Sequence, residues 1–270
     1  MAINDITLAG GMRSNLVSLQ TVTSLQARTT ERLATGKRVN SAVDDPSAYF
    51  AAQNHRNRAN DLAARKDQMG EAIQTVKAAL QGIEGITKLI EQAKGLAASA
   101  RSATGTDRAA LATQFNALRT QIDQMASDGS YKGTNFLDAG SLTVDFNEDG
   151  SSSLTISGFD ASTTGLGIAA AANAWVADTD IDVAVTDMDA ALSTLRGNAK
   201  TLASNNGVVT ARQEFTTSLI NTLTGGADTL TAADTNEEGA NMLALQTRQQ
   251  LGIVALQLSS QAQQSVMRLF

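Results

Sequence analysis

Hydrophobic residues along most of the chain recur at alternating steps of three and four. Between positions 69 and 97 the repeat runs through Met69, Ile73, Val76, Leu80, Ile83, Ile90 and Ala97, and a second stripe with Ile86, Leu89 and Leu96 lies beside it. A period near 3.5 predicts an amphipathic helix, and two adjoining stripes predict a helix that contacts more than one neighbour, as in a bundle. Less regular versions of the pattern predict further helices over 12–33, 106–128, 185–223 and 232–270.

Two glycine-containing clusters interrupt the helical pattern after position 185. They are Asn205-Asn206-Gly207 and Gly225-Gly226. Glycine and asparagine are poor formers of helix interiors. We therefore expect the helix to end or kink at the first cluster and to break more weakly at the second.

A different periodicity governs the middle of the chain. Leu142, Val144 and Phe146 alternate with polar residues, the turn-rich stretch Asn147–Gly150 follows, and the alternation resumes with Leu154 and Ile156. Period-two alternation on both sides of a glycine-containing loop predicts a β-hairpin. The whole of 140–177 reads as short strands and loops.

Helical patterning at both ends and strand patterning between them define the expected fold. Helices of one bundle must cover each other's apolar faces, so the two ends of the chain should pack together. The sequence thus predicts a mainly α protein: an elongated antiparallel helical bundle or coiled coil formed by both chain ends, with a small β-hairpin section in the middle of the chain.

Composition narrows the classes of partner and chemistry. The net charge of −6 argues against a nucleic-acid partner, and the chain has no cysteine, which excludes disulfides and thiolate sites. Between 133 and 195 it carries no Lys or Arg but ten acids, which predicts an acidic surface. Neither a membrane-spanning stretch nor a cleaved signal peptide is recognisable, so we expect no membrane partner and export by another route.

The terminal segments carry more apolar surface than one pair of helices can bury. Isolated amphipathic helices are marginal in water, so we expect these segments to order by association with other subunits. The side chains expected at the subunit interface are Leu16, Leu19, Val22, Leu25, Leu33, Leu245, Leu251, Val254, Leu256, Leu258, Val266, Leu269 and Phe270.

Residues 31–56 combine two adjacent aspartates with the chain's single proline and single histidine. Asp44, Asp45 and His55 suggest a metal or catalytic site, but adjacent aspartates diverge, and no second histidine or nucleophile motif accompanies them. We favour helix capping by Asp44 and Asp45 before Pro46. No enzyme, cofactor or metal motif is found elsewhere, and we expect Trp175 to be a packed anchor.

The sequence resembles bacterial flagellin. Residues 31–45, ERLATGKRVNSAVDD, are similar to the family signature ERLSSGLRINSAKDD, and YKGTNFL at 131–137 is similar to FNGTKLL. QTRQQLG at 246–252 resembles AQILQQAG, and SVMRLF at 265–270 resembles the NVLSLL ending. These matches occur in the family's order at both ends and at the helix-to-strand transition.

The resemblance implies an extracellular filament subunit for swimming motility, secreted unfolded through the flagellar channel. It implies an inner domain of 1–36 and 232–270, and a shell domain of 37–231 that includes the hairpin region 140–177. Implied partners are further copies of the chain, sister flagellins, hook-associated and cap proteins and an export chaperone. Gln92 and Gln114 replace the arginine and glutamate of members recognised by an innate immune receptor, so that recognition is not carried over.

Within this resemblance, 31–56 is expected to join a terminal helix to a shell helix. Gly36 would end the first helix and Asp45-Pro46 would start the second, while Arg38, Asn40, Asp44 and Asp45 would contact neighbouring subunits. Two alternatives remain open: a hook–filament junction protein, which shares the terminal features, and a carbohydrate-binding or enzymatic surface protein that uses the Ser/Thr-rich middle section.

Overall fold

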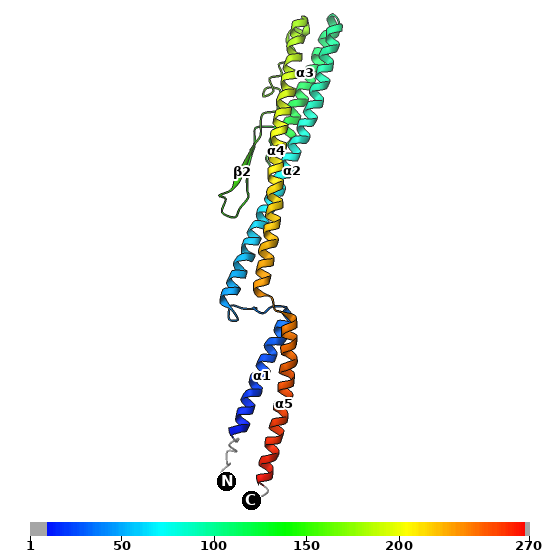
Figure 1. Ribbon diagram of the computed structural model, residues 1–270. Coiled ribbons are helices and arrows are strands. Elements are labelled where there is room, and N and C mark those ends of the chain that lie inside the picture. The colour runs from blue at the N-terminus through cyan, green and yellow to red at the C-terminus, as the bar shows by residue number, and fades with distance from the viewer. Residues whose placement is uncertain (1–9, 268–270) are drawn as a thin grey trace, which may run out of the picture. The chain divides into compact units, whose positions relative to one another are not determined.

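The computed structural model describes residues 10–267 and is dominated by long helices (Figure 1). The chain divides into two compact units: a terminal unit of Met1–Asn57 with Leu223–Phe270, and a central unit of Arg58–Thr222. The elements are α1 (Gly10–Thr35), α2 (Pro46–Ser102), α3 (Gly105–Asp128), β1 (Ser141–Asp145), β2 (Ser153–Ser157), η1 (Ala172–Trp175), α4 (Asp178–Thr231) and α5 (Thr235–Met267). This order confirms the predicted fold class, helical at both ends with a hairpin between.

Helix α4 continues through both glycine-containing clusters, so the predicted breaks at 205–207 and 225–226 were wrong. Glycine in a helix interior costs up to about 1 kcal/mol relative to alanine. Buried neighbours offset that cost: Leu202 and Val209 flank the first cluster, and Ala227 follows the second. Tertiary burial therefore outweighs the local preference to break.

The core of the central unit lies where α2, α3 and α4 run side by side (Figure 1). The stripe predicted on α2 faces this core: Met69, Ile73, Val76, Ile83, Ile90 and Ala97 are all buried. Many of the other buried positions are alanines, among them Ala72, Ala79, Ala93 and Ala100. Small side chains allow close approach of the helices, which explains how so few aromatic residues suffice for this core.

The β1–β2 hairpin covers part of this core with one face only. The strands pair antiparallel, with Leu142 opposite Ile156 and Val144 opposite Leu154 on the inner face. Ile156 is fully buried, and Val144 is nearly so. The outer face consists of Ser141, Thr143, Asp145, Ser153, Thr155 and Ser157. Period-two alternation thus predicted both the hairpin and its buried face correctly.

A strained turn precedes α4. Asn173, Ala174 and Trp175 all have positive φ, at 48°, 48° and 56°, a region that non-glycine residues rarely occupy. Trp175 is fully buried and its ring lies 4.9 Å from that of Phe115, as expected for a packed anchor. Arg108 donates hydrogen bonds to the carbonyl of Val176 and to Asp178, which holds the turn against α3.

Candidate assembly interface

Backbone hydrogen bonds connect the segment after α1 to the end of α4 and the residues that follow it. Gly36, at φ +66°, ends α1 as predicted, and its carbonyl accepts a hydrogen bond from the Ala233 N–H at 2.9 Å. The Arg38 N–H donates to the Thr231 carbonyl at 2.8 Å. Glycine adopts this left-handed conformation without strain, which explains its place at the helix end.

The two adjacent aspartates have different partners. Asp45 is the N-cap of α2, because its Oδ1 accepts from the Ala48 N–H at 3.0 Å. Asp44 does not cap this helix, so that part of the prediction was wrong. Its Oδ2 accepts from the N–H groups of Asn40 and Ser41 and from the Ser41 hydroxyl. Hydrogen bonds from Ser41 and then Asn40 hold the pKa of Asp44 below its usual value.

Three ion pairs lie in the described part of the terminal unit. Arg32 Nη1 is 2.8 Å from Glu238 Oε1, and this pair is largely buried between α1 and α5. Arg56 and Asp228 pair at 3.1 Å. Arg38 and Asp45 are 3.9 Å apart on the surface, where such a pair contributes little to stability. Arg38 therefore remains accessible for contacts outside the chain.

Helices α1 and α5 run side by side and contact each other along a shared seam (Figure 1). Leu245 is buried in the seam, and Leu19, Val22, Leu33 and Leu256 are half-buried. The seam is tight, since a Cβ added to Gly252 would lie 2.7 Å from Leu19 Cδ2. Of the predicted interface residues, these five are thus covered at least in part by packing within the chain.

The remaining described members of the predicted set are exposed. Leu251 and Leu258 expose 64% and 63% of their surface, and Leu16, Leu25 and Val254 also lie open. Val266 lies in α5, but its side chain is outside the described residues, as are Leu269 and Phe270 altogether. An isolated pair of helices therefore leaves large apolar groups in water, as the sequence pattern predicted.

Several exposed apolar residues of the terminal unit were missed from the sequence. They are Val17 on α1, Val43 in the link, Phe50 on α2, and Leu243 and Ile253 on α5. Val17 and Leu243 lie beside the predicted stripes rather than on them. A count of apolar residues on every face of α1 and α5 would have revealed Val17, Leu243 and Ile253, whereas Val43 and Phe50 lie outside these two helices.

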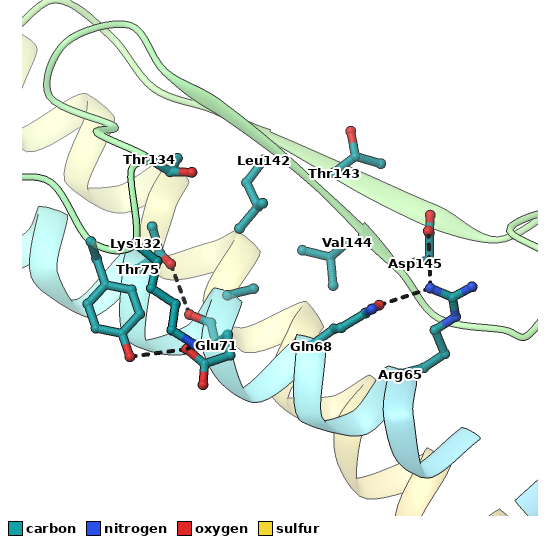
Figure 2. Close-up of a pocket in the computed structure, with 12 residues that line it drawn as sticks. Arg65, Gln68, Glu71, Thr75, Lys132, Thr134, Leu142, Thr143, Val144 and Asp145 are labelled. Carbon is teal, nitrogen blue, oxygen red and sulfur yellow. Dashed lines mark hydrogen bonds and ion pairs between the residues drawn. The ribbon is translucent and has the colours of Figure 1, made fainter. Parts of the chain in front are cut away.

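A cleft of about 410 Å³ between α2 and β1 tests the alternative of a binding or catalytic site (Figure 2). Its charged groups are paired with each other. Glu71 accepts from the Tyr131 hydroxyl at 3.1 Å and lies 2.8 Å from Lys132 Nζ, while Arg65 lies 3.8 Å from Asp145. The hydrogen bond between Lys132 and Glu71 lowers the pKa of Glu71 and raises that of Lys132, so the pair stays charged at neutral pH. The charged side chains that line the cleft are thus already paired with one another.

Half of the ten acids of the 133–195 span are neutralised by ion pairs. Five of them pair with bases from earlier in the chain: Asp145 with Arg65, Glu148 with Arg58, Asp178 with Arg108, Asp182 with Arg101, and Asp189 with Lys94. The surface is therefore less acidic than the sequence of this span alone suggests. Among residues 10–267, no three His, Asp or Glu side chains gather in a way that could hold a metal ion.

The chain is similar in sequence to known proteins of one family. Residues 3–141 match the family model described as the bacterial flagellin N-terminal helical region. The chain is 31% identical to flagellin FljM of Caulobacter vibrioides over 100% of both chains, and 28% identical to a flagellin of Brucella melitensis over 95% of this chain and 96% of the relative. The crystal structure of Bacillus cereus flagellin has a TM-score of 0.48 and 18% identity, covering 55% of this chain and 88% of that one.

Within the described part of the chain, no helix combines the length and apolar character that crossing a bilayer requires. The relatives named above are flagellins, and none of them favours a hook–filament junction protein. The family match covers half of the sequence, and the relatives match it from end to end. The chain therefore belongs to the bacterial flagellin family.

Proposed function

We propose that this protein is a structural subunit of the extracellular flagellar filament, and that α1 and α5 drive its assembly by burying their exposed apolar faces against other copies. The observation that carries the proposal is the contrast between the two units. The central unit buries most of its large apolar side chains around one core and exposes Val176, Val183, Val208 and Phe215, whereas the shorter α1 and α5 leave Leu16, Leu25, Leu251, Val254 and Leu258 open.

The energetic argument follows from surface area. Burying a leucine side chain contributes roughly 1.5–3 kcal/mol, so covering the exposed leucines and valines of α1 and α5 provides a large driving force for association. An isolated pair of amphipathic helices is only marginally stable in water. Contact with other copies would stabilise α1 and α5, because binding to the folded form shifts the folding equilibrium toward that form. Folding of the terminal unit and assembly are then one coupled process.

Membership in the family supports further partners. We include in the proposal sister flagellins, the hook-associated and cap proteins and an export chaperone, together with secretion as an unfolded chain and a non-enzymatic role. The division into an inner domain of 1–36 with 232–270 and a shell domain of 37–231 also belongs to this proposal. It places Arg38, Asn40, Asp44 and Asp45 at the junction, where they would meet neighbouring subunits.

Truncation of α5 tests the proposal. Removing residues 242–270 deletes Leu251, Val254 and Leu258 and uncovers α1, so we expect a soluble, partly helical monomer that forms no filaments. Electron microscopy and sedimentation after seeding would measure filament growth, with the full-length chain as control. Long filaments grown by the truncated chain would contradict assembly through the terminal helices.

A further inference from the structure

The seam between α1 and α5 opens into a groove that is lined mainly by leucine and arginine side chains. Two adjoining hollows, of about 270 and 410 Å³, share Leu25 and Arg248 as lining residues. We call this groove, lined by Leu19, Val22, Leu25, Arg28, Arg248 and Leu251, the arginine groove. It lies wholly within the helix pair of the terminal unit.

The charges of the groove are unbalanced. Arg32 also lines it, but is neutralised by Glu238 at 2.8 Å. Arg28 and Arg248 are exposed, and among the described residues neither makes a hydrogen bond or an ion pair. Two guanidinium groups therefore flank an apolar floor without forming an ion pair in the part of the chain that the structure describes.

Glu31 is the single acidic residue of α1, and it follows Arg28 by three residues, which places the two about 60° apart around the helix. Glu31 follows the buried Thr29 by two residues, which places it about 160° around the helix from the seam. Its carboxylate is exposed and has no partner among the described residues. Gln20 and Ala27 are exposed on the same side of the helix, which makes a narrow surface that another helix pair can approach closely.

We propose that the arginine groove of one subunit binds Glu31 on the α1 helix of a second copy of this chain. This inference rests on the proposed function, since it names the contact through which the terminal helices recognise each other. Arginine binds carboxylates through charge-assisted, often bidentate hydrogen bonds, which fix orientation as well as attraction.

The geometry also accounts for open-ended growth. Glu31 lies about 160° around α1 from the buried Thr29 and so points away from the floor of the groove; in the proposed contact each copy uses its groove on one neighbour and its Glu31 on another, which makes the contact heterologous. Heterologous contacts that do not close into a ring generate helical filaments.

The apolar floor favours a helix of a second copy over a small free anion. A free carboxylate would neutralise Arg28 and Arg248 but would leave Leu25 and Leu251 in water. An α1 surface that carries Ala27 one turn from Glu31 covers these leucines and supplies the charge in one contact.

Charge reversal of full-length protein tests the contact. Arg248→Glu and Glu31→Arg should each lower the rate of filament elongation from wild-type seeds, measured by light scattering, by at least about tenfold, because each places like charges opposite one another. The double variant Arg248→Glu/Glu31→Arg restores opposite charges between its own copies. Its elongation on its own seeds should return to within about threefold of wild type.

Arg196→Glu is the matched control, because Arg196 is an exposed arginine of α4 that makes no ion pair among the described residues. An equal loss in this control, unimpaired growth of the single variants, or no recovery in the double variant would each overturn the inference. The inference would also be overturned if the Arg248→Glu monomer lost thermal stability and the double variant regained it, because residues 31 and 248 would then interact within one chain. Failure of the wild-type protein to elongate would instead contradict the proposed function.

Discussion

At the scale of single residues, Asp44 and Asp45 show what composition can and cannot specify. Both aspartates fit the residue preference for a helix N-cap, but a proline at the first helical position, Pro46, already favours Asp45 over Asp44. The structure assigns the cap to Asp45 and gives Asp44 a turn of its own with Asn40 and Ser41. The turn of Asp44 depends on the path of the chain before the helix, and residue preferences alone did not predict it.

The hydrogen bonds to Asp44 predict how the link between α1 and α2 responds to acid. Its pKa is lowered in the folded state, so the contribution of this turn is complete above the usual value of 3.8 and is lost as the pH falls through the lower, folded-state pKa. NMR titration of the full-length monomer should give a midpoint for Asp44 below 3.8. A midpoint at or above 3.8 would show that the turn does not form in solution.

At the scale of elements, regular periodicity was a reliable guide and local helix breakers were not. The α2 stripe from Met69 to Ala97 and the inner face of the hairpin were predicted because burial itself produces their periods. The clusters at 205–207 and 225–226 misled because helix propensity is weak next to tertiary packing. The turn at 173–175 could not be foreseen, since none of its residues favours positive φ strongly enough to mark it.

The uninterrupted α4 predicts that alanine would stabilise the helix at a glycine whose missing side chain nothing requires. A Cβ at Gly207 would meet no atom within 4 Å, so Gly207→Ala should raise the free energy of unfolding by roughly 0.5–1 kcal/mol in denaturant titration. Gly82→Ala on α2 is the matched control, because its Cβ would collide with Cδ1 of the fully buried Leu137. That control should lose about 1–3 kcal/mol. A destabilised Gly207→Ala would indicate that the helix bends at this point in solution.

At the scale of the whole molecule, buried apolar surface is distributed unequally between the units. In the described part of the terminal unit the buried apolar side chains are Val39, Ala52, Leu223, Ala227 and Leu245. The central unit instead contains one contiguous core that includes Phe115, Phe136, Ile156 and Trp175. The hairpin region 140–177 contributes side chains to this core, so it is an integral part of the folded central unit. The sequence showed its strands but not how deeply they pack.

This distribution predicts the order in which the monomer is digested. Local opening is easiest where few apolar contacts are made, so a protease of broad specificity should cut α1 and α5 first and leave a resistant fragment close to 58–222. Mass spectrometry over a time course would identify the fragments, and assembled filaments serve as the comparison in which α1 and α5 become protected. Early cleavage within 58–222 would contradict the assignment of the stable core.

The pairing of α1 with α5 also has a consequence in time. These are the first and last of the described α-helices, and the ion pair between them joins residues 206 positions apart. At a synthesis rate of about 5–20 residues per second, α1 has left the ribosome for roughly 10–40 s before its partner exists. Throughout that interval its leucines have no intramolecular cover. The seam that completes the subunit is thus the last contact the nascent chain can make, and the chain is without it for nearly the whole of its synthesis.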